Sequence, residues 1–197
     1  MDFKTWRNVN QRDVAYIANL FKVPYLEKMA THIKKVTKGE LNTGNEEDEK
    51  LRKDKNIKDR TTWKISPDDF VQEFLNDLND FIIKANRKHF QFDLDTIDGP
   101  YYAEYPFDGR NTFNWHMDIG TYPYNQRKLS FSLLLSDPSE YEGGDLQIWI
   151  NNKDYITIPK EPGSITFFPS FLPHRVTPIT KGIRRNFIGF VLGKPYR

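Results

Sequence analysis

The sequence contains no cysteine among its 197 residues. This absence excludes a disulfide framework, a thiolate zinc site, an iron–sulfur cluster and a cysteine nucleophile, and it is compatible with a reducing compartment. Long apolar runs are also missing. None approaches the roughly 18–20 residues of a membrane span, and the start Met1-Asp2-Phe3-Lys4 opens no apolar signal segment. We therefore expect a cytoplasmic globular protein without a membrane partner.

A strong charge of one sign is the third absence. The chain has 29 basic and 27 acidic residues, a net charge of +2 and a pI near 8.6. Nucleic-acid-binding proteins carry a clustered basic excess, so we expect no nucleic-acid partner. A length of 197 residues is typical of a single domain. Composition leaves the oligomeric state open.

Residues 1–100 are predicted to be mainly helical. Asn10 is typical of a helix N-cap, and apolar residues follow it at helical spacing as far as Phe21. Pro24 then interrupts or restarts this helix, because proline has no N–H to donate. The pair Ser66-Pro67 predicts a second helix start, from which an apolar stripe continues to Ala85.

A highly charged segment separates these helices. Of its 27 residues, from Lys34 to Arg60, 16 are charged and none is aromatic. Such a composition buries too little apolar surface to offset the entropy of ordering the chain. A solvated loop over residues 34–60 is one interpretation, and a lid that folds over a bound substrate is the other.

Beyond residue 100 the pattern changes to short runs of period two, separated by turn residues. Seven such runs predict an antiparallel sandwich or small barrel. Gly143-Gly144 between two of them predicts a tight turn with positive φ rather than a phosphate cradle. The predicted strands are Thr112–Asp118, Lys128–Ser136, Asp145–Ile150, Tyr155–Ile158, Ser164–Phe168, Arg175–Pro178 and Arg184–Leu192.

Two of the four histidines stand in a pattern typical of a metal site. His116 and Asp118 are two residues apart on a predicted strand, so their side chains share one face. His174 opens another strand 58 residues after His116. Two imidazoles and one carboxylate with open positions are the ligand set of non-haem Fe(II) oxygenases. His32 and His89 have no acidic residue two positions on, and we interpret them as structural.

Alternation along the strands predicts which side chains surround this site. The apolar face opposite His116, formed by Phe113, Trp115 and Met117, is expected to pack against the N-terminal helices. In residues 128–136 the small, partly polar face is expected to line the pocket. Arg184 is either an ordinary solvated arginine or a buried guanidinium that pairs with a carboxylate through two charge-assisted hydrogen bonds.

With these motifs the chain resembles the 2-oxoglutarate/Fe(II) dioxygenases, most closely the prolyl 4-hydroxylase-like, PKHD-type enzymes. The resemblance is dense over residues 101–192. It is carried by His116-Met117-Asp118, Arg127-Lys128-Leu129-Ser130, Tyr141-Glu142-Gly143-Gly144-Asp145-Leu146, His174-Arg175-Val176-Thr177-Pro178 and Gly182-Ile183-Arg184. It implies a mainly β protein whose core, residues 101–197, is a double-stranded β-helix (jelly roll) buttressed by the N-terminal helices within one domain, residues 1–197.

The resemblance also implies the chemistry of an oxidoreductase. Fe(II) would bind His116, Asp118 and His174, and 2-oxoglutarate would reach from the iron to Arg184, with Tyr105 as a further contact. Dioxygen would be consumed, succinate and CO2 released, and ascorbate would return oxidised iron to Fe(II). Arg127 would lie near the pocket mouth, where it is either mainly solvated or in contact with the substrate. At Leu134 the sequence departs from animal prolyl hydroxylases, which carry a co-substrate-binding tyrosine there.

Four functions remain open at this stage. The first is a prolyl hydroxylase acting on a peptide or protein substrate, a hypothesis that rests on the resemblance alone. The second is a 2-oxoglutarate-dependent hydroxylase of a free amino acid or other small molecule. The third is a non-catalytic jelly-roll module that binds a partner. A cupin-like metal enzyme without an oxo acid is a further alternative, and it predicts that Arg184 is dispensable.

Overall fold

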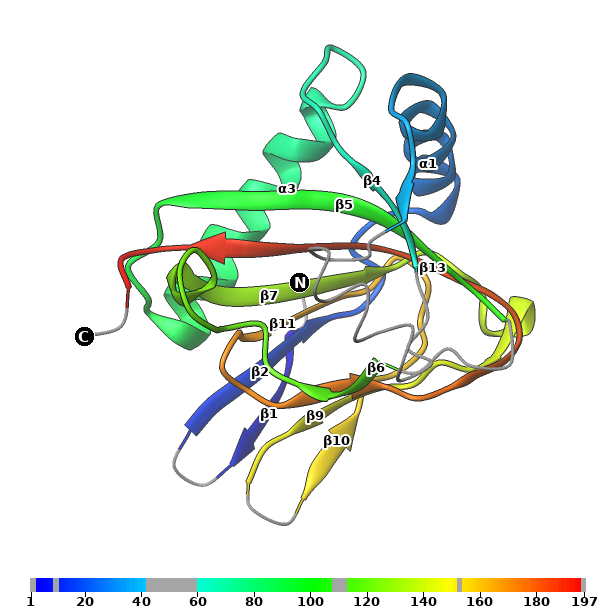
Figure 1. Cartoon of the computed structure of the whole chain (residues 1–197). Helices are drawn as coiled ribbons and strands as arrows, with labels where there is room; N and C mark the ends of the chain where they lie inside the picture. The colour runs from blue at the N-terminus through cyan, green and yellow to red at the C-terminus, as the bar shows by residue number, and fades with distance from the viewer. Residues whose placement is uncertain (1–2, 9–10, 42–59, 108–112, 152–153, 196–197) are drawn as a thin grey trace.

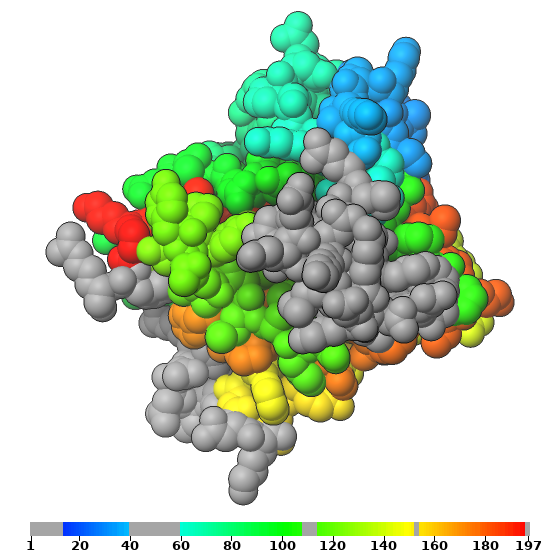
Figure 2. Space-filling view, viewed as in Figure 1, coloured from blue at the N-terminus to red at the C-terminus, as the bar shows by residue number. Residues whose placement is uncertain are grey.

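Two antiparallel sheets and two helices form the protein in the computed structural model, which describes residues 3–8, 11–41, 60–107, 113–151 and 154–195. The helices are α1 (Val23–Val36) and α3 (Gln72–Ala85), and both lie against one side of the larger sheet (Figure 1). In the space-filling view they lie side by side at the top of the molecule (Figure 2). Neither helix, nor any other in the described ranges, is long and apolar enough to cross a membrane.

The larger sheet has the strand order β1-β2-β11-β7-β13-β5-β4-β3, and β8 pairs with β13 beside this path. The smaller sheet has the order β10-β9-β12-β6. The larger sheet contains β1 (Phe3–Asn8), β2 (Gln11–Ile17), β3 (Glu40–Leu41), β4 (Thr61–Lys64), β5 (Thr96–Pro106), β7 (Arg127–Leu134), β8 (Tyr141–Gly143), β11 (Ile165–Pro169) and β13 (Ile179–Leu192). The smaller contains β6 (Phe113–His116), β9 (Leu146–Trp149), β10 (Tyr155–Thr157) and β12 (His174–Val176). Short turns of helix are η1 (Asn86–Phe90), η2 (Tyr124–Gln126) and η3 (Pro138–Glu140).

The main core lies between the helices and the larger sheet. Leu129, Phe131 and Leu133 point from β7 toward the helices, on the face opposite the one that the alternation predicted to line the pocket. Phe74 of α3 contacts Phe187 of β13 with ring centroids 5.3 Å apart. Burying a side chain of this size contributes about 1.5–3 kcal/mol. The same alternation turns the small and polar side chains of β7 toward the space between the sheets.

The helix predicted from Asn10 to Phe21 is wrong. Residues 11–17 form β2, which lies between β1 and β11 in the larger sheet. Val14 and Tyr16 pack toward the smaller sheet, whereas Ala15 and Ile17 pack toward the helices. A strand buried on both faces has no alternation of polar and apolar residues, so its apolar run resembles a helix segment.

The predicted helix starts differ in accuracy. Helix α1 begins at Val23 with Pro24 in its first turn, so proline restarts the chain as a helix there. Helix α3 begins at Gln72, about five residues after the predicted start at Ser66-Pro67. The intervening residues form a turn in which Asp68 Oδ1 accepts hydrogen bonds from the backbone N–H groups of Phe70 and Val71, both at 3.0 Å.

The seven predicted strands of the C-terminal half are all present, with ends shifted by a few residues. Gly143 and Gly144 have φ angles of +73° and +65°, which confirms the predicted turn. Strand β5 was not predicted, because Gly99 and Pro100 stand within it and normally mark a turn. Of the charged segment 34–60, residues 42–59 lie outside the described residues.

Candidate metal centre and adjoining cavity

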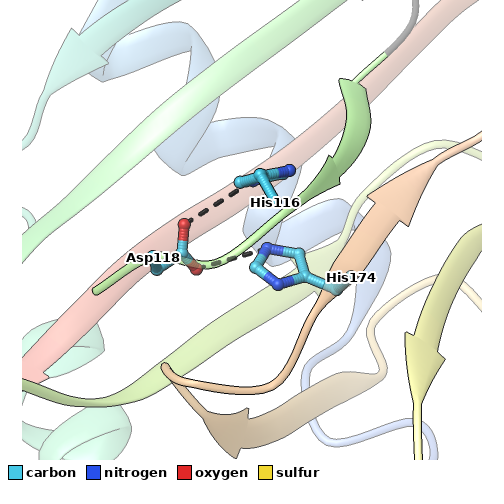
Figure 3. Close-up of side chains that lie close together, drawn as sticks. All are labelled: His116, Asp118 and His174. Atoms are coloured by element: carbon cyan, nitrogen blue, oxygen red, sulfur yellow. Dashed lines mark ion pairs between the residues drawn. The ribbon is translucent and has the colours of Figure 1, made fainter. Parts of the chain in front are cut away.

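The two histidines and the aspartate of the predicted site lie together between the sheets (Figure 3). His116 ends β6 and His174 begins β12, and the two residues are paired directly across these neighbouring strands. Asp118 Oδ1 lies 3.7 Å from His116 Nε2, and Asp118 Oδ2 lies 3.3 Å from His174 Nε2. All three ligand atoms lie within 4.8 Å of one another. The structure therefore brings together the three side chains that the sequence selected.

Backbone carbonyls orient both imidazole rings. His116 Nδ1 lies 2.7 Å from the carbonyl oxygen of Asn114, and His174 Nδ1 lies 3.0 Å from that of Leu172. A carbonyl oxygen only accepts, so each Nδ1 carries the hydrogen and each Nε2 keeps its lone pair. Burial lowers the pKa of His174 below its usual value, although the Asp118 carboxylate opposes this effect. The hydrogen bonds at Nδ1 thus leave each Nε2, the atom that lies near the Asp118 carboxylate, as the nitrogen available to bind a metal ion.

This donor set fits a ferrous ion. Two imidazole nitrogens and one carboxylate on one side of the ion leave other coordination positions open for small molecules. A closed structural zinc site would need a fourth ligand, usually cysteine, which the chain lacks. Among the described residues, no other group of three or more His, Asp or Glu side chains is arranged to hold a metal ion.

The larger sheet holds Asp118 in place. Ser130 Oγ on β7 donates to Asp118 Oδ2 at 2.6 Å, and Ser130 Oγ also lies 3.0 Å from Ser170 Oγ. The backbone N–H of Asp118 donates to the carbonyl oxygen of Ser170 at 3.0 Å. Partners of this kind orient metal ligands and tune their affinity. Sequence alternation had placed Ser130 in the pocket without assigning it a partner.

Arg127 has a defined structural role, so its interpretation as a mainly solvated residue is wrong. Its Nη2 lies 3.2 Å from Asp98 Oδ2, and its Nη1 donates to the Asp118 carbonyl oxygen at 3.3 Å. Its Cζ lies 3.4 Å from the centroid of the Phe190 ring. The guanidinium thereby connects β7, β5 and the segment that carries Asp118. No local pattern indicated this, since the partners are distant in sequence.

A cavity lined by both polar and apolar side chains lies further along β7 from the triad. Ser130 contacts Asp118, and the next side chains on the same face of β7, Ser132 and Leu134, line the cavity. Arg184 on β13 lines it as well and is only 3% exposed. Its Nε and Nη1 atoms are buried without a hydrogen-bond partner in the described part of the chain. The alternative of a solvated Arg184 is therefore wrong.

Tyr105 lies beside Arg184 because the two residues are paired between β5 and β13. Arg184 Cζ is 5.6 Å from the centroid of the Tyr105 ring. The Tyr105 hydroxyl oxygen accepts a hydrogen bond of 3.0 Å from Arg60 Nη1. Arg60, at the end of the charged segment, was not predicted to approach this site, and its sequence context carries no signal that would have found it.

The predicted packing of Trp115 and Met117 against the N-terminal helices is wrong. The helices cover the larger sheet, whereas these residues belong to the outer face of the smaller one. Trp115 stacks on Trp149 with ring centroids 4.9 Å apart, and Arg175 Cζ lies 4.7 Å from the Trp115 ring. Met117 is 53% exposed. Strand alternation predicted the face correctly but not which layer covers it.

The two other histidines lie outside the site. His32 Nε2 on α1 lies 2.7 Å from Asp68 Oδ2, and His89 is buried in η1. Their interpretation as structural residues agrees with these positions.

Comparison with known protein families gives a match between residues 101–192 and the model of the 2OG-Fe(II) oxygenase superfamily. A PKHD-type hydroxylase of Synechococcus sp. strain CC9605 is 35% identical over 80 residues, which are 41% of this chain and 36% of that protein. A PKHD-type hydroxylase of Cupriavidus metallidurans is 40% identical over 79 residues, 37% of this chain and 34% of that protein. The matches thus span about a third of the length of these relatives.

Solved structures show the same fold over most of the chain. A prolyl-4-hydroxylase of Pseudomonas putida superimposes with a TM-score of 0.71 at 18% identity and covers 92% of this chain and 93% of its own. A prolyl hydroxylase of Trichoplax adhaerens, in complex with a hypoxia-inducible factor peptide fragment, gives a TM-score of 0.72 at 14% identity and covers 93% and 85%. These likenesses confirm the predicted double-stranded β-helix buttressed by helices.

Proposed function

We propose, on the premise that residues 101–192 match the model of the 2OG-Fe(II) oxygenase superfamily, that the chain is a prolyl hydroxylase dependent on Fe(II) and 2-oxoglutarate. The reaction would add one oxygen atom to a C–H bond of a prolyl residue in a peptide or protein and release succinate and CO2. The observation that carries the proposal is the convergence of His116, Asp118 and His174 beside a cavity lined by a buried, unpaired arginine.

The triad would hold the ferrous ion. His116 and His174 offer their Nε2 atoms, while each Nδ1–H stays bonded to a backbone carbonyl and keeps the ring from turning. The Asp118 carboxylate offers one negative charge, and Ser130 fixes its orientation. A ferrous ion bound here supplies the redox and dioxygen chemistry, which amino-acid side chains cannot provide.

Arg184 would bind the distal carboxylate of 2-oxoglutarate. A guanidinium pairs with a carboxylate through parallel charge-assisted hydrogen bonds, and two nitrogen atoms of Arg184 are buried without such a partner in the described residues. Tyr105 stands beside Arg184 in the neighbouring strand and would be a further contact of the co-substrate. Ascorbate is proposed only as an external reductant, and it is included in the assay for that reason.

A prolyl substrate is supported by the activities of the proteins to which the chain is similar. The two relatives compared above are PKHD-type hydroxylases, and two of the solved structures of similar fold are prolyl hydroxylases, one of them bound to a peptide. Since one fold can carry several activities, the substrate requires a direct test.

The test combines succinate release with mass spectrometry of the substrate. The protein is incubated with Fe(II), 2-oxoglutarate, ascorbate and a library of proline-containing peptides, with matched peptides that carry alanine in place of proline. We expect succinate and one added oxygen on proline only. The Asp118→Ala variant should give neither product. Arg184→Ala should lose activity at least a hundredfold, because it would leave the distal carboxylate of 2-oxoglutarate buried without its partner, which costs about 3–5 kcal/mol.

Each alternative predicts a different outcome. Absence of both metal binding and succinate would identify a non-catalytic module. Undiminished turnover of Arg184→Ala would indicate a metal enzyme that uses no oxo acid. Oxygen added to a free amino acid or another small molecule, and to none of the peptides, would keep the dioxygenase and overturn the peptide substrate.

A further inference from the structure

The cavity beside the metal centre contains a tyrosine whose O–H has no acceptor among the described residues. Tyr141 on β8 lines the cavity and is 3% exposed. Its hydroxyl oxygen is buried beside the Arg184 guanidinium, which can only donate to it, and no acceptor among the described residues takes the phenolic O–H. A buried phenol normally finds a partner within the protein, because an unpaired one loses its hydrogen bonds to water. Its partner is therefore to be sought in what occupies the cavity.

Tyr141 and Arg184 converge on one point of the cavity wall. A Cβ atom built on Gly144 would lie 3.0 Å from Arg184 Cδ and 3.0 Å from Tyr141 Cε2. Gly144 also has a φ of +65°, which L side chains rarely adopt. The glycine thus leaves room for both side chains to approach, and both carry polar atoms without partners among the residues described.

The charges around the cavity favour one carboxylate. Lys160 also lines it, but Lys160 Nζ lies 2.7 Å from Asp145 Oδ1 and is thereby neutralised. Burial raises the pKa of Tyr141, although the charge of Arg184 opposes this, so the phenol keeps its proton and can donate it. One unpaired guanidinium and one phenolic O–H together match the two oxygens of a single carboxylate.

A ligand must extend from the triad to meet these donors. Ser130 contacts Asp118, whereas Ser132 and Leu134 line the cavity roughly 7 and 14 Å further along β7. Leu134 is paired with Asn186, two residues after Arg184 on β13. A carboxylate bound at Arg184 therefore belongs to the end of the ligand remote from the metal.

We propose that the Tyr141 hydroxyl is the second donor to the distal carboxylate of the oxo acid, and that with Arg184 it selects a dicarboxylic over a monocarboxylic oxo acid. This inference rests on the proposed function and assigns it a further binding residue. The same geometry makes Tyr141 a determinant of co-substrate affinity and not of the chemical step, since it lies at the far end of the cavity.

The test compares two ligands on three proteins. Wild type, Tyr141→Phe and Tyr102→Phe are loaded with Mn(II), and the dissociation constants of 2-oxoglutarate and 2-oxopentanoate, which lacks the distal carboxylate, are measured by calorimetry. Tyr102 is the matched control, because it is buried on the helix side of the sheet and its hydroxyl donates to Glu104 at 2.8 Å. Thermal unfolding verifies that each variant is folded.

We expect Tyr141→Phe to weaken 2-oxoglutarate binding about ten- to one-hundredfold, the usual effect of losing a hydrogen bond to a charged group. Binding of 2-oxopentanoate should stay within twofold of wild type, and Tyr102→Phe should change neither constant. In turnover, KM for 2-oxoglutarate should rise while kcat stays unchanged. The inference would be overturned if Tyr141→Phe bound 2-oxoglutarate as tightly as wild type does, or if it lost the same factor of affinity for both acids. A wild-type protein that binds neither acid would overturn the proposed function, and this inference with it.

Discussion

Ser130 Oγ donates a 2.6 Å hydrogen bond to Asp118 Oδ2, and this contact joins the two sheets at the metal site. The two histidines belong to the smaller sheet, whereas Ser130 belongs to the larger one. The orientation of the carboxylate therefore depends on how the sheets pack, and not only on the two-residue spacing of His116 and Asp118. Ser170 supports the same hydroxyl at 3.0 Å.

The first prediction concerns this hydroxyl. We expect Ser130→Ala to weaken metal binding about ten- to one-hundredfold, the usual effect of losing a partner of a metal ligand. The measurement is competition for Mn(II) or Fe(II) against a chelator of known affinity. Ser130→Thr keeps a hydroxyl and should retain most of the affinity. Wild-type affinity in Ser130→Ala would show that the other contacts of Asp118 hold it without the serine.

The second prediction concerns stabilisation by the metal ion. A ligand that binds only the folded state stabilises it, by about 2.7 kcal/mol at a concentration of one hundred times Kd. We expect Mn(II) to raise the Tm of wild type and a chelator to reverse the increase. Asp118→Ala should show no increase, whereas Glu142→Ala, which removes an exposed carboxylate, should behave as wild type. An equal increase in Asp118→Ala would place the ion elsewhere.

The third prediction concerns the attachment of α1 to the sheet. Arg185 on β13 points away from the cavity, and its two terminal nitrogens lie 2.9 Å from Glu27 and 2.8 Å from Glu140. Since Arg185 is 20% exposed, we expect Arg185→Ala to lower the free energy of unfolding by about 2–3 kcal/mol, less than for a fully buried pair. Urea unfolding measures this change.

Lys181→Ala is the control for Arg185. Its ion pair with Glu142 joins side chains that are 74% and 63% exposed. Exposed pairs contribute about 0–1 kcal/mol, so the loss should be small. If both variants lost the same free energy of unfolding, the partial burial of Arg185 would not strengthen its ion pairs.

The fourth prediction concerns acid stability. The hydrogen bond with His32, followed by that from the backbone N–H of Val71, holds the pKa of Asp68 below its usual value. A carboxyl group whose pKa is lower in the folded state stabilises the fold above its unfolded pKa, about 3.9, and this contribution is lost as the pH falls through the folded pKa. The free energy of unfolding should therefore decrease as the pH falls below about 4.

Urea unfolding between pH 3 and 7 tests this prediction. Asp68→Asn should flatten part of the acid decrease, while the exposed neighbour Asp69, changed to Asn, should leave it in place. An identical acid profile for wild type and Asp68→Asn would assign the decrease to other groups.

Local patterns in the sequence were enough to predict several features of the structure. The period-two alternation of residues 128–136 separated the apolar side of β7 from the side expected to line the pocket, because strand side chains alternate between faces wherever the strand lies. The two-residue spacing of His116 and Asp118, with His174 at the start of a later strand, selected the three side chains that the structure brings together as a candidate metal site. Pro24 marked the first turn of α1, since its fixed φ angle suits that position.

Only the tertiary structure decided the remaining features. Residues 11–17 form a strand that the sequence pattern did not reveal. Its residues 14–17 are buried on both faces, so the strand lacks the alternation of polar and apolar residues by which a strand is recognised in a sequence. The roles of Ser130 and Arg127 toward Asp118 depend on partners in other strands. Tyr141 belongs to a turn motif in sequence, yet β8 pairs with β13 and brings its hydroxyl to the cavity that Arg184 lines. Spacing along a strand determines which side chains share a face, but the packing of one sheet on another determines what that face meets.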